Sequence, residues 1–103
     1  MPKPPLPADE CRTMVDVRVG VDDLDERLVE LLAERFAYMR AAARIKYDRN
    51  AVRDEDRKAL VIANARLRGE ALGLPGQVIE DIWERLVEGS IAYEFDAWDR
   101  KKG

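Results

Sequence analysis

Arg35 and Lys46 are two cationic residues whose spacing could produce a binding site. They are eleven residues apart, so on a helix, at about 100° per residue, they fall within about 20° of each other. About 16 Å of helix would separate their backbones, and two long side chains can converge on one small ligand across that distance. Long cationic side chains more often only solvate a helix face, so the spacing alone is weak evidence for an anion site.

Arg18, Ser90 and Glu94 extend this pattern. Arg18 lies seventeen residues before Arg35, about 25 Å along the same expected helix, too far to share a ligand within one chain. Antiparallel pairing of two copies would instead bring Arg18 of the partner subunit to the site. Ser90 and Glu94 are four residues apart and share one face of another expected helix. Helical pattern alone favours an exposed Glu94, although its apolar neighbours leave partial burial open.

The composition excludes several kinds of chemistry. The 103 residues include no histidine and one cysteine, Cys11, so Cys–His and Ser–His triads are excluded, as are most zinc sites. We expect neither metal nor cofactor. A net charge of −3 without a basic stripe argues against nucleic-acid binding. The unpaired thiol fits a reducing compartment, and no apolar run reaches the length of a signal peptide or a membrane span, so we expect a cytoplasmic protein.

A long helix is expected over residues 14–47, after an extended N-terminal arm over residues 1–13. Apolar residues recur there with helical spacing, without a proline, and acidic residues precede basic ones as the helix dipole favours. At 1.5 Å per residue this helix is about 50 Å long, whereas a compact domain of this size has a radius of gyration of about 13 Å. Two shorter helices cannot cover its apolar stripe, so we expect an intertwined homodimer.

Two shorter helices complete the all-α domain expected over residues 14–103. Residues 47–50 interrupt the first helix, and Asp54 is an N-cap for a second helix that ends near Leu72. Gly73 suits the left-handed position after that helix, and Pro75 suits the first turn of a third helix that extends through Trp98.

These segments together resemble the all-helical (type II) chorismate mutase family over roughly residues 15–98. The resemblance lies in four segments in order: Val17-Arg18 with LDERLVELLAER over residues 24–35, ARIK over residues 43–46, VRDEDR over residues 52–57, and SIAYE over residues 90–94. Each segment is common alone. All four, in this order on a three-helix chain, are fairly specific.

The resemblance implies a role for each matching residue. Arg18 of the neighbouring chain and Arg35 would bind the two carboxylates of chorismate, and Lys46 would bind a carboxylate and the ether oxygen. Asp54 and Arg57 would complete the pocket, Ser90 would place the substrate, and Glu94 would hydrogen-bond the ether oxygen. Rearrangement of chorismate to prephenate, a step in aromatic amino acid biosynthesis, is concerted and needs no nucleophile. A catalyst supplies a compact conformer and stabilises charge on the ether oxygen.

Two positions depart from the family's pattern. Lys58 stands where many relatives carry a glutamate that binds the substrate hydroxyl, which leaves recognition of that hydroxyl open. Glu94 stands where many relatives carry glutamine, so it must be protonated to donate a hydrogen bond. A substrate dianion favours the protonated form and Lys46 opposes it, so we expect activity to fall as pH rises, with a flatter profile in Glu94→Gln.

Two alternatives remain open. Residues 9–12 and 16–18 resemble the isochorismate pyruvate lyase branch of salicylate synthesis, which shares the fold and most of the pocket. Those lyases carry glutamine at the position of Glu94 and lack the features of residues 52–54. A non-catalytic helical dimerisation module would explain the apolar stripes but not the positions of the charged residues. Activation by another shikimate-pathway enzyme is a further open point.

Overall fold

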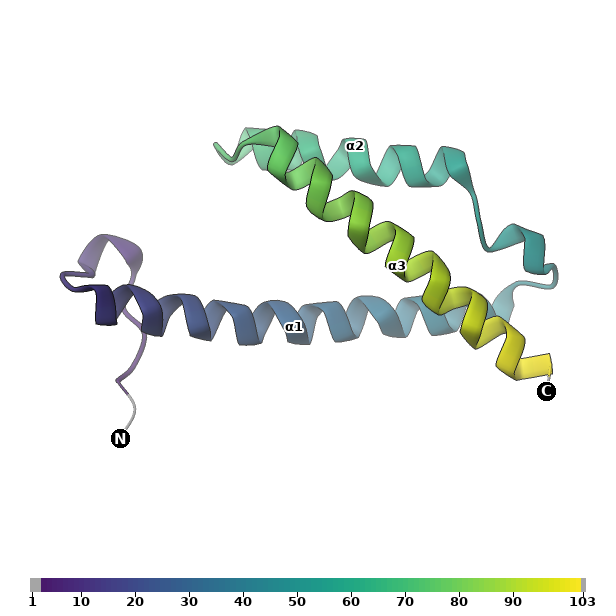
Figure 1. The fold of residues 1–103 in the computed structure, drawn as a ribbon, viewed down its shortest axis with the longest axis horizontal. Helices are drawn as coiled ribbons and strands as arrows, with labels where there is room; N and C mark the ends of the chain where they lie inside the picture. Colours follow the sequence, from purple (N-terminus) through teal and green to yellow (C-terminus); the bar gives the residue numbers. More distant parts are fainter. Residues whose placement is uncertain (1–2, 103) are drawn as a thin grey trace. The chain divides into compact units, whose positions relative to one another are not determined.

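A computed structural model describes residues 3–102, and it confirms the all-α class. Its elements are the 3₁₀ turn η1 (Ala8–Glu10), helix α1 (Met14–Ile45), the 3₁₀ turn η2 (Arg49–Ala51), helix α2 (Glu55–Ala71) and helix α3 (Gly76–Lys102) (Figure 1). Residues 3–102 contain no strand. None of the described helices is both long enough and apolar enough to span a bilayer. The chain divides into two compact units between Arg35 and Phe36, within α1, and each unit is described separately.

The first unit contains the N-terminal arm and the first two-thirds of α1. Thr13 Oγ1 accepts a hydrogen bond from the backbone N–H of Asp16 at 3.2 Å, and Asp16 Oδ2 accepts from the N–H groups of Arg12 and Thr13 at 3.0 and 3.3 Å. Lys3 forms an ion pair with the same carboxylate, which is buried. Hydrogen bonds from Lys3 and from the Arg12 backbone lower the pKa of Asp16 to about 2. This reciprocal cap starts α1 and fixes the arm to it.

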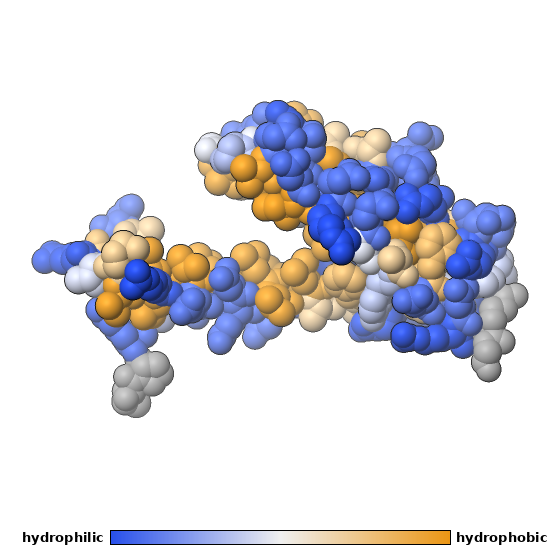
Figure 2. Space-filling model, in the orientation of Figure 1, coloured by the Kyte–Doolittle hydropathy of each residue, from blue (hydrophilic) through white to orange (hydrophobic). Residues whose placement is uncertain are grey.

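An apolar row follows α1 through the first unit, as its sequence period predicts. Leu24, Leu28 and Leu31 are 49%, 55% and 59% exposed, and Val17, Val21 and Leu32 are exposed beside them. Figure 2 shows apolar surface along this part of the helix. Exposed apolar area of this extent is characteristic of an interaction surface.

In the second unit, α2 and α3 run in opposite directions from a tight turn (Figure 1). Gly73 has a φ of +81°, the left-handed conformation that its position predicts. The N–H of Leu74 donates to the carbonyl of Gly69 at 2.9 Å, which closes the end of α2. A Cβ atom added to Gly69 would lie 2.7 Å from Ile79 Cγ1, so the missing side chain allows α2 and α3 to approach closely.

The hydrophobic core lies in the second unit. It joins the end of α1, the segment before α2 and the inner face of α3 through five buried side chains: Ala43, Val52, Val87, Ile91 and Trp98. Two polar residues of α3, Ser90 and Glu94, are buried as well. Buried polar groups need hydrogen-bond partners, and those partners define the candidate site.

Candidate active site

A partly buried ion pair joins the end of α1 to α3. Lys46 Nζ donates to Glu94 Oε2 at 2.6 Å, and the side chains of Lys46 and Glu94 are 29% and 6% exposed. The helical pattern favoured an exposed Glu94, and that prediction is wrong. Ile91 and Trp98, three residues before and four after Glu94, are buried on the same face of α3, so this face turns Glu94 toward the core.

Ser90 lies one helical turn before Glu94 on the same face. It is 3% exposed, and its Oγ donates to the carbonyl of Leu86 at 2.7 Å. The structure thus confirms that Ser90 and Glu94 share a face, and it places a hydroxyl group, a carboxylate and an ammonium group within one stretch of α3 and the adjoining helix end. Such a set can both accept and donate hydrogen bonds.

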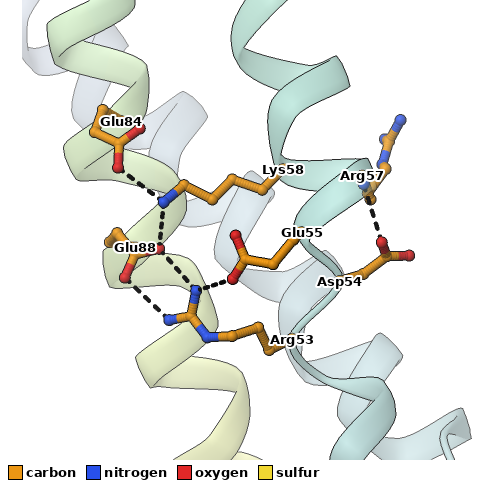
Figure 3. Close-up of polar contacts among 7 residues, drawn as sticks. All are labelled: Arg53, Asp54, Glu55, Arg57, Lys58, Glu84 and Glu88. Carbon is orange, nitrogen blue, oxygen red and sulfur yellow. Dashed lines mark hydrogen bonds and ion pairs between the residues drawn. The ribbon is translucent and has the colours of Figure 1, made fainter.

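Asp54 caps α2, as its position in the sequence predicts. Its Oδ1 accepts from the backbone N–H of Arg57 at 3.0 Å (Figure 3). The Arg57 side chain is exposed. The contributions of these two residues to a substrate pocket stay predictions.

Lys58 belongs to a group of charges that we call the α3 charge network: Arg53, Glu55, Lys58, Glu84 and Glu88 (Figure 3). Lys58 Nζ lies 2.8 Å from one carboxylate oxygen of Glu84 and 2.8 Å from one of Glu88. Arg53 donates through Nη2 and Nη1 to both oxygens of Glu88 at 3.0 and 3.1 Å, and through Nη1 to Glu55 at 2.8 Å. The network therefore connects the start of α2 to α3.

These contacts change the acid–base properties of the network. Hydrogen bonds from Arg53, and then from Lys58, lower the pKa of Glu88 to about 2. Hydrogen bonds to Glu84 and Glu88 raise the pKa of Lys58. Both shifts favour the charged forms of Glu88 and Lys58, so the ammonium of Lys58 is held by α3 near neutral pH. The sequence shows Lys58 itself but not its partners, which lie 26 and 30 residues further along the chain.

Arg49 is a second connection to α3 that the sequence pattern did not indicate. Its Nε and Nη2 donate to the two oxygens of Asp99 at 2.8 and 3.2 Å. Its guanidinium carbon lies 4.4 Å from the centroid of the Phe95 ring, within the range of a cation–π contact. The Arg49 hydrogen bonds lower the pKa of Asp99. Arg49 thus fixes η2 against the same helix that carries Glu94.

Arg18 and Arg35 lie in the first unit. Arg18 is exposed on α1, and Arg35 is half-buried at the end of the unit. Their convergence on the Lys46–Glu94 pair stays a prediction.

A cleft of about 460 Å³ in the first unit is a poor candidate for an anion site. Its walls are mostly apolar side chains of the arm and α1, and its charged members, Asp23 and Arg27, pair with each other at 3.2 Å. Within residues 3–102, no three acidic or thiol side chains gather in a way that could bind a metal ion.

Comparison with known proteins gives consistent matches. Residues 17–95 match the family described as chorismate mutase type II. An isochorismate pyruvate lyase of Pseudomonas aeruginosa is 25% identical over 95 residues, which cover 92% of this chain and 94% of the lyase. T-proteins of Enterobacter agglomerans and Haemophilus influenzae are 31% and 28% identical over 78% and 77% of this chain. The chain spans 22% and 21% of the length of those T-proteins.

Proposed function

From the premise that the chain belongs to the type II chorismate mutase family, we propose that it rearranges chorismate to prephenate. The observation that carries the proposal is the buried Lys46–Glu94 pair, with Ser90 one turn away. Prephenate is a precursor of aromatic amino acids, so the proposal assigns the chain to that pathway.

Lys46 and Glu94 would act on the ether oxygen of the substrate. As the carbon–oxygen bond breaks, negative charge grows on this oxygen, and a fixed ammonium donor stabilises that charge more than it stabilises the ground state. Lys46 donates to Glu94 in the structure, so its ammonium group would have to donate a further hydrogen bond to the substrate when the substrate binds. Glu94 would donate to the same oxygen only in its protonated form, so we expect activity to fall as pH rises.

The two substrate carboxylates would be bound by Arg35 and by Arg18 of the partner subunit. The apolar row of the first unit supports a homodimer, because Leu24, Leu28 and Leu31 are half-exposed there and pairing of two such helices would cover them. In a two-fold symmetric dimer, each site would combine residues of both chains.

A complementation experiment tests this shared site. Arg18→Gln and Arg35→Gln should each be inactive, but a heterodimer of the two variants regains one site with both arginines. Mixing equal amounts under exchange conditions should restore about a quarter of the wild-type activity. No recovery despite subunit exchange, measured by mass spectrometry of the native dimer, contradicts a shared site. Full activity in a folded Arg35→Ala dimer would contradict the proposed role of Arg35, whereas a folded wild-type dimer without activity would favour a non-catalytic dimerisation module.

Isochorismate pyruvate lyase activity is the second candidate, and one observation favours it. The match to the Pseudomonas lyase covers 95 of the 103 residues, so it must begin at or before residue 9. It therefore includes part of the N-terminal arm. The match to the family starts only at residue 17 and leaves the arm out. Its substrate, isochorismate, carries the same two carboxylates and ether oxygen. One pocket could therefore bind both molecules.

An assay with each substrate separately distinguishes the two activities. We expect purified protein to form prephenate from chorismate at a rate that falls with pH. Salicylate and pyruvate from isochorismate, without prephenate from chorismate, would establish the lyase instead. If neither substrate is consumed by a folded dimer, the proposed function is wrong.

A further inference from the structure

The backbone of Lys46 lies just past the C-terminal end of α1, where the last carbonyl groups need hydrogen-bond donors. Helix α1 ends at Ile45, and the N–H of Lys46 makes the last turn by donating to the carbonyl of Ala42 at 3.0 Å. The last carbonyl groups of a helix have no partner within the helix. The carbonyls of Ala43 and Lys46 therefore have to be satisfied from elsewhere.

Two side chains of α3 provide these donors. Trp98 Nε1 donates to the carbonyl of Lys46 at 3.1 Å. Lys101 Nζ donates to the carbonyls of Lys46 and Ala43, both at 2.6 Å. The same ammonium lies 5.1 Å from the centroid of the Trp98 ring. Its positive charge at the C-terminal end of α1 also suits the helix dipole.

One stripe of α3 thus contacts both ends of Lys46. Trp98 and Lys101 follow Glu94 by four and seven residues, which puts all three on one face of the helix. Glu94 binds the ammonium group of Lys46, while Trp98 and Lys101 bind its carbonyl. Trp98 is 7% exposed in the core, so its indole has little freedom to move.

We infer that Trp98 and Lys101 are positioning residues that fix Lys46 by its carbonyl and so set where its ammonium group lies beside Glu94. Neither residue needs to contact the substrate. The effect of this role on catalysis rests on the proposed function, because the ammonium of Lys46 stabilises the ether oxygen only if the chain rearranges chorismate. Small displacements of such a donor lower kcat more than they raise KM.

The variants that test this inference remove one donor at a time. Trp98→Phe keeps a ring in the core and deletes the indole N–H, and Lys101→Met keeps the aliphatic length and deletes the ammonium. Because the carbonyl of Lys46 keeps one donor in each single variant, we expect kcat to fall about threefold, and about tenfold in the double variant. KM should stay within about twofold. Arg100→Met is the matched control, since Arg100 is an exposed cation next to Lys101 on α3.

A readout independent of activity is the NMR cross-peak between the Lys46 ammonium protons and Nζ, assigned by its absence in Lys46→Met. We expect this peak in wild type and Arg100→Met, where Glu94 binds the ammonium, and its broadening or loss in the double variant at unchanged helical circular dichroism. An unchanged cross-peak and an unchanged kcat in a folded double variant would overturn the inference.

Two further outcomes are decisive. If Trp98→Phe does not fold, Lys101→Met decides alone, because Lys101 is exposed and its loss leaves the core intact. A broadened cross-peak or a roughly threefold lower kcat then supports the inference, and a cross-peak and kcat that are both unchanged overturn it. If wild type consumes neither substrate, the proposed function fails, while the cross-peaks still decide whether α3 positions Lys46.

Discussion

Helix α3 carries two ion-paired sites of the same chemistry in different surroundings. In its first half, Glu84 and Glu88 bind Lys58, and their side chains are 53% and 35% exposed. In its second half, Glu94 binds Lys46 and is 6% exposed. Lys58 itself is 17% exposed and Lys46 is 29% exposed, so the two sites differ in their carboxylates and not in their lysines. Water screens Glu84 and Glu88, and several partners share their charge. Glu94 is buried, so its interaction with Lys46 takes place at a lower dielectric, where a change in one charge has a larger effect on the other.

The largest expected difference between the two sites is in catalysis. Lys46→Met removes the proposed donor to the ether oxygen, and kcat/KM should fall by about 10²- to 10³-fold. Lys58→Met removes an ammonium that is already bound to two carboxylates, so kcat/KM should stay within about threefold. Initial rates with chorismate and isochorismate measure both. Equal losses would mean that the burial of Glu94 does not distinguish the two sites.

The second expected difference is in the pH dependence of activity. Glu94→Gln supplies a neutral donor at every pH, so the decline of rate with rising pH should flatten. Glu88→Gln should keep the wild-type profile. Rates from pH 5 to pH 9 in both variants test this. A sloping profile in Glu94→Gln would show that protonation of Glu94 is not what limits the rate.

The third difference is in acid stability. The folded-state pKa of Glu88 is about 2, against an ordinary value of 4.5, so its stabilising contribution is present above pH 4.5 and is lost as pH falls toward 2. Wild type should therefore lose more stability between pH 5 and pH 2 than Glu88→Gln does. Urea midpoints across this range measure the effect, with Asp96→Asn, an exposed carboxylate on α3, as control.

The smallest effect concerns salt. Arg53→Gln should lower the thermal midpoint by roughly a few degrees at low ionic strength. In 1 M salt, where the Debye length is about 3 Å, this difference should shrink. The activity loss in Lys46→Met should persist there, because the ammonium donor is absent at any ionic strength. A thermal shift in Arg53→Gln that does not depend on salt would mean that the network contributes by packing.

The sequence predicts local features of this chain well. Asp54 as the cap of α2, Gly73 in the left-handed conformation and the three helices all follow from a few neighbouring residues. The burial of Glu94 does not, because it depends on which face of α3 meets the end of α1, 48 residues earlier. The indole contact to the carbonyl of Lys46 is equally non-local, since nothing in the residue type Trp98 specifies an acceptor.

In the candidate site, too, the sequence indicates which residues matter, whereas their contacts with distant residues come from the structure. Family resemblance identified Lys46 and Glu94 as acting on one atom, and the structure brings these two side chains together. The resemblance also identified Lys58 as a departure from the family's pattern, but it did not indicate what the ammonium of Lys58 would bind. In the structure this ammonium binds Glu84 and Glu88 of the α3 charge network. Arg18 and Arg35 stay predictions, because their roles require a second chain.

The absent side chain at Gly69 gives protein engineers a way to change the site without altering a charged residue. Gly69→Ala would force α2 and α3 apart near Ile79, at a cost of about 1–3 kcal/mol for overpacking. Because α3 is one continuous helix from Gly76 to Lys102, displacement at its beginning would tilt the segment that carries Ser90 and Glu94. Graded substitutions at this distant position would show how much misalignment the chemistry tolerates.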